Sequence, residues 1–297
     1  MTTRSTTAPG ALERARRYLE LVRFSHTLFA LPFALMALFL ATRGDWPAPK
    51  TTGLILLCMV AARTTAMAYN RLIDRDVDAQ NPRTATRHLP AGTLRVMEVA
   101  ALTVACAVVF VAGAWLLNPW AFRLALPVLA VLLFYSHTKR FTSLCHLVLG
   151  VALGLAPLGV WIAVRGEFDS SLVIPAVLGA AVMAWVAGFD VIYACQDRDF
   201  DRGHGLHSLP ARLGIARALI VSRVLHVAMI VLLLVLARVA HLGAIYLAGV
   251  AVTALLLAWE HRLVRADDLS RVNVAFFTAN GCVSLVLAAC TIAESLT

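Results

Sequence analysis

Long apolar stretches without charge constrain this chain more than any other feature of its sequence. A helix needs about 20 apolar residues to cross the hydrocarbon core of a bilayer. Six charge-free stretches reach roughly that length: Phe24–Thr42, Val99–Phe122, Phe141–Val164, Ser170–Phe189, Val239–Trp259 and Val272–Ala293. Three weaker stretches complete the set: Thr51–Tyr69, which contains Arg63, the short Leu124–Thr138, and Ala218–Ala237, which contains Arg223. The sequence therefore predicts nine membrane-spanning helices.

The composition supports this interpretation. Of the 297 residues, 60% are apolar and 14% are charged, whereas a soluble domain has about 45–50% apolar and about 25% charged residues. A chain of this kind is neither a soluble enzyme nor a disordered chain nor a nucleic-acid-binding domain. We expect an all-α polytopic membrane protein whose nine transmembrane helices surround a central cavity. Residues 1–17 would form a disordered tail, and residues 18–297 a single domain.

The basic residues predict how the chain is oriented. Nineteen of the 26 Lys and Arg residues lie in the N-terminal segment and in every second loop, on the side that holds Arg71–Arg95. Five lie on the other side, and the remaining two, Arg63 and Arg223, lie inside stretches. Because cytoplasmic loops carry an excess of Lys and Arg, we expect the N-terminus on the cytoplasmic face of a bacterial inner membrane.

Acidic residues gather in two short segments on that same side. Seven of the 17 acids directly follow or end the second and sixth stretches. One DxxxD pattern on a helix is common and usually solvated, but two copies at equivalent ends of membrane helices indicate function, because carboxylates at a membrane are costly. Residues four or seven apart share one helix face, which predicts one row of Asn70, Asp74 and Asp78 and another of Asp190, Asp197 and Asp201.

These rows offer only oxygen ligands. Mg²⁺ typically takes one or two carboxylates and fills its other positions with water and substrate phosphate. Two facing rows would hold two Mg²⁺ ions with a diphosphate between them. The metal ligands predicted in this way are Asn70, Asp74, Asp78, Asp197 and Asp201, with Asp190 as a further catalytic group.

Three motifs resemble the UbiA superfamily of intramembrane aromatic prenyltransferases. YNRLIDRDVD (Tyr69–Asp78), followed by NPRTATRHLPAG, is similar to the first signature of that superfamily. FDVIYACQDRDFD (Phe189–Asp201), followed by GLHSLPARLG, is similar to the second, and FYSHTKRFT (Phe134–Thr142) to the loop between helices four and five. The resemblance covers nearly the whole chain after Tyr18.

The resemblance implies a Mg²⁺-dependent reaction in which a polyprenyl group passes from polyprenyl diphosphate to an aromatic ring carbon. It implies that Lys139 and Arg140, together with Arg83 and Arg87, bind diphosphate, and that Tyr193 positions the ring or the diphosphate. Asp76 or Asp199 could receive the ring proton. The expected partners are the two substrates and the lipid bilayer, without nucleic acid.

Arg63 bears on the identity of the acceptor. It lies seven residues before Asn70 and so points toward the same cavity. A buried arginine needs a partner, which a substrate carboxylate or a group of the helix bundle would supply. The stretch His26–Ala41 departs from the pattern expected of the hydroxybenzoate enzymes of ubiquinone synthesis. Together with NRLIDRD and GLHSLPARLG, it looks closer to a UbiA-like subgroup that includes the hydroxynaphthoate enzymes of menaquinone synthesis. Both acceptors are phenolic acids, and 4-hydroxybenzoate and 1,4-dihydroxy-6-naphthoate stay open.

Two rival interpretations follow from the same residues. A cation-coupled transporter would use the acids as an ion pathway, although carriers tend to place such sites near the bilayer midplane, and here the acids lie at one membrane face. A UbiA-type enzyme with an acceptor that lacks a carboxylate (haem, a chlorophyllide or a lipid) is the other rival, and Arg63 discriminates between the two kinds of acceptor.

Overall fold

The fold is built entirely from helices in the part of the chain that the structure describes. The computed structural model describes residues 11–22, 27–42 and 44–297. The long helices are α2 (Thr27–Thr42), α3 (Pro49–Ile73), α5 (Val96–Leu117), α6 (Pro119–Thr138), α7 (Cys145–Arg165), α8 (Val173–Ala194), α11 (Ile215–Val239), α12 (Ala244–Leu263) and α14 (Asn280–Ser295). Shorter elements are α1 (Ala11–Leu21), α4 (Arg75–Gln80), η2 (Ser170–Leu172), η3 (Cys195–Asp197), α9 (Arg198–Gly203), α10 (Leu209–Leu213), α13 (Val272–Val274) and the π-helix η4 (Ala275–Ala279).

Eight helical segments within the described residues are long and apolar enough to cross a membrane. They confirm the predicted all-α membrane fold. The predicted first span, Phe24–Thr42, begins among residues 23–26, which lie outside the described part. Helix α2 has 16 residues, or about 24 Å of α-helix, which is less than the roughly 30 Å thickness of the hydrocarbon core.

The predicted disordered tail was too long. Of residues 1–17, the first ten lie outside the described part, but Ala11–Leu21 form helix α1. This helix is tied to the bundle, because Arg17 donates to the carbonyl oxygen of Thr93 and Arg71 donates to that of Leu21. Leu21 is buried against α3 and the loop that follows α4.

The predicted stretch Val99–Phe122 was also wrong at its end, because it joins parts of two helices. Helix α5 ends at Leu117, and Asn118 caps the next helix by accepting from the backbone N–H of Ala121 at 2.8 Å. Pro119 follows as the first residue of α6, where its missing N–H costs nothing. Similarly, residues 141–144 and 240–243 belong to connections rather than to the spans assigned to them.

Helix α8 forms the centre of the bundle. Leu178, Val182 and Trp185 are almost wholly buried where α8 packs against α7 and α11. Two glycines permit the contact with α7, since a Cβ at Gly179 would lie 2.5 Å from the carbonyl oxygen of Gly154, and a Cβ at Gly154 equally close to that of Gly179. Small residues at such crossings let membrane helices approach closely.

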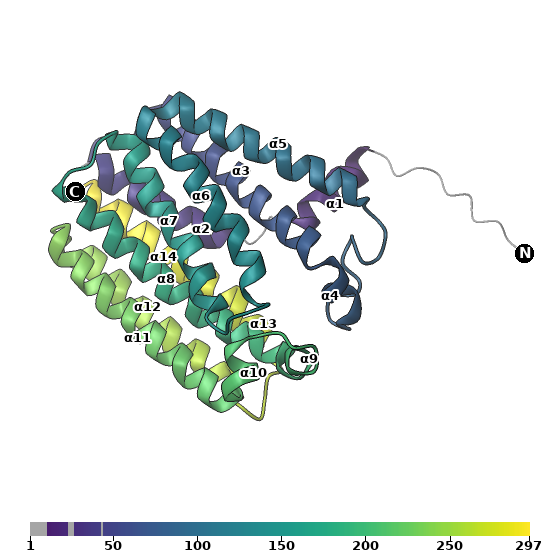
Figure 1. The fold of residues 1–297 in the computed structure, drawn as a ribbon. Helices are drawn as coiled ribbons and strands as arrows, with labels where there is room; N and C mark the ends of the chain where they lie inside the picture. Colours follow the sequence, from purple (N-terminus) through teal and green to yellow (C-terminus); the bar gives the residue numbers. More distant parts are fainter. Residues whose placement is uncertain (1–10, 23–26, 43) are drawn as a thin grey trace, which may run out of the picture.

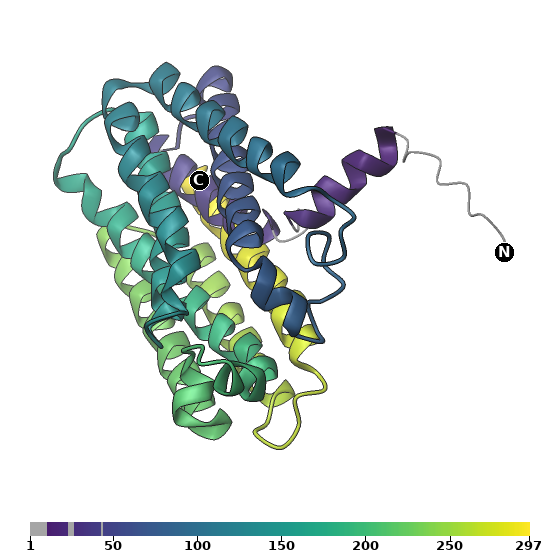
Figure 2. The same ribbon diagram turned by 45° about the vertical axis from the view of Figure 1, so that its right-hand side comes forward.

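All the short helices that follow the acidic motifs lie at one end of the bundle. Figure 1 shows α4, α9, α10 and α13 together there, with the C-terminus at the opposite end, and the rotated view in Figure 2 agrees. Contacts between the loops support this arrangement, because the His207 N–H donates to the carbonyl oxygen of Lys139 at 2.7 Å. The two predicted motifs therefore share one end of the molecule.

Candidate functional site

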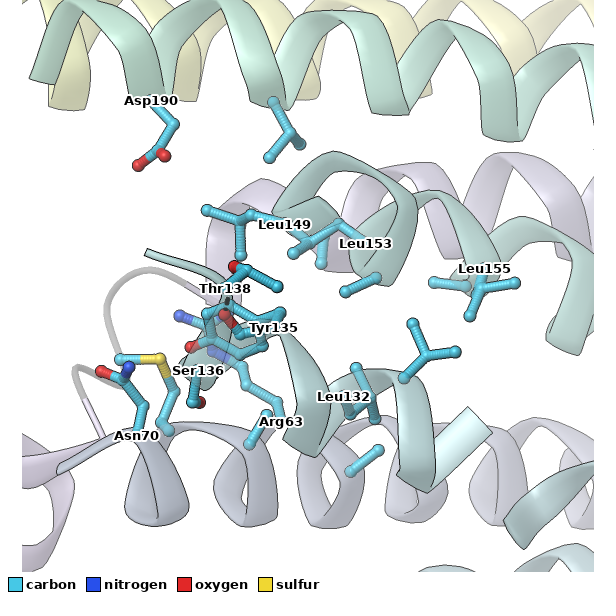
Figure 3. Close-up of a pocket in the computed structure, with 18 of the residues that line it drawn as sticks. Arg63, Asn70, Leu132, Tyr135, Ser136, Thr138, Leu149, Leu153, Leu155 and Asp190 are labelled. Carbon is cyan, nitrogen blue, oxygen red and sulfur yellow. Dashed lines mark hydrogen bonds between the residues drawn. The ribbon is translucent and has the colours of Figure 1, made fainter. Parts of the chain in front are cut away.

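A cavity of about 720 Å³ lies among α3, α5, α6, α7 and α8, within the range of about 300–1,000 Å³ that is usual for small-molecule sites. One part of its wall is apolar and includes Leu132, Leu149 and Leu153 (Figure 3). Twelve of the predicted site residues line this one cavity: Arg63, Asn70, Asp74, Asp78, Arg83, Arg87, Lys139, Arg140, Asp190, Tyr193, Asp197 and Asp201. It is thus polar at the motif end and apolar elsewhere.

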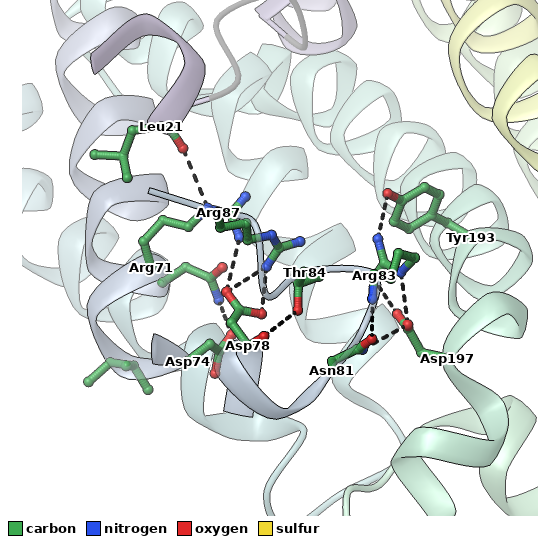
Figure 4. Close-up of polar contacts among 12 residues, drawn as sticks. Leu21, Arg71, Asp74, Asp78, Asn81, Arg83, Thr84, Arg87, Tyr193 and Asp197 are labelled. Atoms are coloured by element: carbon green, nitrogen blue, oxygen red, sulfur yellow. Dashed lines mark hydrogen bonds and ion pairs between the residues drawn. The ribbon is translucent and has the colours of Figure 1, made fainter. Parts of the chain in front are cut away.

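Arg83 joins the two acidic motifs. Its Nε donates to Asp197 Oδ1 at 2.8 Å, its Nη2 contacts the other oxygen of that carboxylate, and its Nη1 donates to the hydroxyl of Tyr193 at 2.9 Å (Figure 4). Asn81 Nδ2 also donates to Asp197 Oδ1, at 3.1 Å. A guanidinium fork matches a carboxylate in this two-point manner. The contact connects residues 114 positions apart, and so holds the two loops together.

The first motif keeps its row of oxygen ligands although the helix does not continue. Helix α3 ends at Ile73 with Asp74 as its cap, and the backbone N–H of Asp78 still donates to the carbonyl oxygen of Asp74 at 2.7 Å. Asn70 Nδ2 donates to Asp74 Oδ2 at 2.8 Å. Arg87 Nη1 lies 2.7 Å from both oxygens of Asp78, and Arg71 Nη1 lies 4.0 Å from one of them. The helix is therefore broken at Asp74, but Asn70, Asp74 and Asp78 still face the same cavity.

The second motif is interrupted in the same way. Helix α8 ends at Ala194, and the 3₁₀ turn Cys195–Asp197 precedes α9. Asp201 is fully buried, and its Oδ1 lies 2.7 Å from Lys139 Nζ. Arg140 from the same loop as Lys139 reaches the first motif, with its Nη2 3.5 Å from Asp74 Oδ1. Four acids are therefore paired with four basic residues around the polar end of the cavity.

These pairings shift the protonation equilibria of the loop residues. Burial, together with the neighbouring carboxylate of its motif, raises the pKa of Asp74. Burial lowers the pKa of Arg83, but the hydrogen bond to Asp197 and the charges of Tyr193, Asp197 and Asp78 together outweigh that effect, and the pKa rises overall. The pKa of Lys139 likewise rises, because the charge of Asp201, its hydrogen bond to Lys139 and the charge of Asp197 act with smaller contributions to outweigh the effect of burial. Both cations are therefore held in the charged form.

The oxygen donors fit a hard divalent cation in their chemistry. No three His, Cys, Asp or Glu side chains converge on one point in the described residues, because the carboxylates contact guanidinium and ammonium groups instead. Asp201 Oδ2, however, is buried and has no hydrogen-bond partner in the described part of the chain. A carboxylate oxygen without a donor is a group that a metal ion would satisfy.

Arg63 occupies the position that the sequence predicted for it. It projects from α3 into the cavity two turns before Asn70 (Figure 3). Its Nε is buried and has no hydrogen-bond partner among the residues described here. For this nitrogen, the described bundle therefore does not supply the hydrogen-bond partner that the sequence left open as an alternative to a substrate carboxylate.

Sequence reasoning missed His146. This residue lies near the start of α7, is 2% exposed, and lines the cavity. Its Nδ1 lies 2.7 Å from Asp190 Oδ2, and its Nε2 accepts from the backbone N–H of Leu209 at 3.3 Å. Since Nε2 accepts, Nδ1 carries the proton and donates to the carboxylate. Asp190 itself points into the cavity (Figure 3). The signal in the sequence was a lone histidine in an apolar stretch.

The two candidates for the proton acceptor, Asp76 and Asp199, do not reach the site. Their side chains are 78% and 88% exposed and pair with the adjacent Arg75 and Arg198. Neither residue lines the cavity. The face that carries Asp74 and Asp78 turns inward, so the residue between them turns outward, and the structure gives no support to the expectation that either acid takes the ring proton.

Fold and site together define an integral membrane protein whose polar loops close one end of an apolar cavity. The model of the UbiA prenyltransferase family matches residues 30–281. The chain belongs to the UbiA prenyltransferase family and is a prenyltransferase. The interpretation as a transporter is thereby overturned.

Named relatives and solved structures agree with this assignment. The chain is 29% identical over 277 residues to a 4-hydroxybenzoate octaprenyltransferase of Aeromonas salmonicida, covering 92% of this chain and 94% of that one. It is 37% identical over 179 residues to a 4-hydroxybenzoate solanesyltransferase of Synechocystis sp., and this match spans 59% of either chain.

Among solved structures, the apo structure of a UbiA homologue from Aeropyrum pernix K1 has a TM-score of 0.82 at 37% identity, over 91% of this chain and 98% of that one. A UbiA homologue from Archaeoglobus fulgidus bound to DMAPP and Mg²⁺ has a TM-score of 0.73 at 22% identity, over 94% of this chain and 98% of that one. The second likeness concerns the fold alone.

Proposed function

We propose that this enzyme transfers a polyprenyl group from polyprenyl diphosphate to a ring carbon of a phenolic carboxylic acid, in a Mg²⁺-dependent reaction of ubiquinone or menaquinone biosynthesis. The observation that carries the proposal is the cavity itself, which combines paired acidic and basic side chains at one end with apolar walls and with Arg63, whose buried Nε has no hydrogen-bond partner among the described residues. The names of the relatives favour 4-hydroxybenzoate as acceptor, and 1,4-dihydroxy-6-naphthoate is the other candidate.

The four basic residues of the polar end would bind the diphosphate: Arg83, Arg87, Lys139 and Arg140. Each now contacts an aspartate, so substrate binding would exchange one anionic partner for another. Asn70, Asp74, Asp78, Asp197 and Asp201 would hold Mg²⁺, for which two ions are the expected number. When bound there, Mg²⁺ neutralises the charge that develops on the departing diphosphate. Fixed basic side chains assist the same departure.

The side chains of the cavity wall would assist the remaining steps of the reaction. The allylic C–O bond breaks, and its electron pair leaves with the diphosphate. Apolar side chains such as Leu149 and Leu153 would exclude water from the allylic cation, and Tyr193 would position the ring or the diphosphate. The ring carbon ortho to the phenolic hydroxyl then bonds to the allylic carbon. The proton from that ring carbon would pass to the carboxylate of Asp190, which His146 orients.

Arg63 would hold the acceptor carboxylate. The support is its place on the cavity wall and the absence of a hydrogen-bond partner for its Nε in the described residues. A carboxylate bound there would supply the missing partner in a charge-assisted hydrogen bond.

We propose further that residues 18–297 form one catalytic domain in the bacterial inner membrane. Side chains from α3 to the π-helix η4 line the same cavity, which supports a single domain. The excess of Lys and Arg on the motif side supports an orientation with the N-terminus and both acidic motifs facing the cytoplasm. Labelling of cysteines introduced at positions 80 and 205 tests it, since both should react from the cytoplasmic side.

The decisive test is transfer of a labelled polyprenyl group by the purified protein in liposomes, with 4-hydroxybenzoate and 1,4-dihydroxy-6-naphthoate offered in parallel. We expect transfer to one acceptor, dependent on Mg²⁺ and lost in Asp74→Ala and Asp197→Ala. The matched controls Asp76→Ala and Asp199→Ala change exposed acids of the same motifs and should keep full activity. Binding of prenyl diphosphate without transfer to either acid would contradict the proposed acceptor and favour haem, a chlorophyllide or a lipid.

A further inference from the structure

A second group of buried polar residues lies outside the proposed reaction. Glu260 of α12, Asn280 of α14 and Trp185 of α8 are all fully buried. Asn280 Nδ2 donates to Glu260 Oε1 at 3.0 Å, and Trp185 Nε1 donates to Asn280 Oδ1 at 2.7 Å. An ionisable side chain inside a membrane helix is costly and usually has a function.

Asn280 fastens the π-helix that precedes it. Its Nδ2 lies 3.3 Å from the carbonyl oxygen of Ala275 and 3.2 Å from that of Phe276. An amide nitrogen has two protons, so Asn280 shares them between Glu260 and the carbonyl groups of the π-helix. Short π-helical segments inside α-helices frequently occur at functional sites. The buried group is thus attached directly to an irregular segment of backbone.

The π-helix presents Phe276 to the catalytic cavity. Phe276 lines the cavity wall, and its ring centroid lies 4.4 Å from that of Tyr193. The same tyrosine contacts Arg83, whose Cζ lies 5.1 Å from the ring centroid and whose Nη1 donates to the hydroxyl. Arg83 in turn holds Asp197. A chain of direct contacts therefore runs from Asn280 to the group proposed to bind diphosphate.

The geometry depends on the π-turn. One residue of a regular α-helix corresponds to a rotation of about 100°. If residues 275–279 relaxed to an α-helix, Phe276 and Asn280 could not keep their present partners at the same time. The hydrogen bonds of Asn280 oppose that relaxation.

We propose that Asn280 is a positioning residue, held by Glu260 and Trp185, which fixes the π-helix so that Phe276 supports Tyr193 and, through it, Arg83. The inference rests on the proposed function in one respect, namely that Arg83 binds the diphosphate. Asn280 uses Oε1 of Glu260 as its acceptor, whereas Oε2 has no hydrogen-bond partner among the described residues and lies 3.7 Å from His226 Nδ1.

The test measures the dissociation constant for farnesyl thiodiphosphate with Mg²⁺, using the full chain in lipid nanodiscs. An aromatic pair contributes enough to change binding by up to about tenfold. We expect Asn280→Asp, which keeps the acceptor for Trp185 but loses the amide donors, and Phe276→Leu each to weaken binding by about tenfold. The double variant should bind no more weakly than either single variant, because both changes remove the same support.

Two further variants separate positioning from general stability. Glu260→Leu should weaken binding, whereas Glu260→Gln, which keeps the acceptor oxygen, should restore it. Thr291→Val removes another buried hydroxyl of α14, which donates to the carbonyl oxygen of Leu287, and should leave binding unchanged. If Asn280→Asp does not fold, the comparison of the two Glu260 variants with Phe276→Leu decides the same question.

The outcomes separate the two proposals. If the wild-type chain binds the analogue and the folded Asn280→Asp variant binds it equally well, the inference fails and the proposed function stands. Losses that multiply in the double variant would also overturn the inference. If the wild-type chain does not bind the analogue at all, the proposed function fails and the inference fails with it.

Discussion

Replacing Arg63 by leucine tests the proposed acceptor most directly. The guanidinium lines the cavity and its Nε has no hydrogen-bond partner among the described residues. A substrate carboxylate that reaches it would form a hydrogen bond to a charged group, worth about 1.5–3 kcal/mol. Since about 1.4 kcal/mol corresponds to a factor of ten, Arg63→Leu should lower kcat/KM for the acceptor by roughly 10- to 150-fold.

The assay compares 4-hydroxybenzoate with 4-hydroxybenzamide, which has the same ring and hydroxyl but no negative charge. The wild-type enzyme should prefer the acid, and Arg63→Leu should remove most of that preference while KM for the prenyl diphosphate stays constant. Without substrates, the variant should not unfold at a lower temperature, because removal of a buried charge that lacks a full set of partners does not cost stability.

Arg223→Leu is the matched control, since Arg223 is the other arginine within a predicted span and does not line the cavity. It should leave the preference for the acid intact. Equal losses with the acid and the amide in Arg63→Leu, or a clearly lower unfolding temperature, would refute the reasoning. Arg63 would then be a structural residue of the bundle.

Three further predictions follow from the polar end of the cavity. Arg83→Lys should lower kcat/KM for prenyl diphosphate by about 100-fold, because one ammonium group cannot replace both the two-point contact with Asp197 and the hydrogen bond to Tyr193. Steady-state kinetics that give a kcat/KM near the wild-type value would contradict this prediction. His146→Leu should lower kcat without changing KM for prenyl diphosphate, because an Asp190 that is no longer oriented removes the ring proton slowly. Proton removal should then become visible as an isotope effect with ring-deuterated acceptor. An unchanged kcat, or a reduced kcat without an isotope effect, would argue against a role of His146 in orienting Asp190. Chelation with EDTA should abolish transfer, and Mg²⁺ should restore it, while the unfolding temperature of the free enzyme changes little because the acids are already paired; transfer that persists in EDTA would exclude the proposed metal dependence.

The membrane fold was predictable because hydropathy depends on local sequence. A run of apolar residues such as Ser170–Phe189 has no alternative to the bilayer, and counting spans places alternate loops at the same end. The boundary between α5 and α6 was predictable too, since Asn118 and Pro119 form a cap and a first helical residue, but the stretch was divided by hydropathy alone. The breaks in the helices at Asp74 and at Cys195–Asp197 were not predictable, because residues spaced four apart share a face in a broken helix as well as in a straight one.

The candidate site likewise has some features that local sequence predicts and others that it does not. The row of Asn70, Asp74 and Asp78 follows from local periodicity, and so does the direction of Arg63. The contact of Arg83 with Asp197 and that of His146 with Asp190 depend on how distant segments pack, which local patterns do not encode. The sequence therefore indicated which residues line the cavity, but not which of them contact one another.

The pairing of four acids with four bases around the cavity has a consequence for selectivity in the cell. Without bound Mg²⁺, such a site carries little net charge and exerts little long-range attraction on anions. A soluble nucleotide or inorganic phosphate that enters it then only exchanges one charged partner for another. A prenyl diphosphate bound as proposed would make the same exchange and would also transfer its hydrocarbon chain from water or lipid to the apolar walls. The chain, more than the charge, then decides which molecule occupies the cavity, and the bilayer that concentrates such lipids takes part in the discrimination.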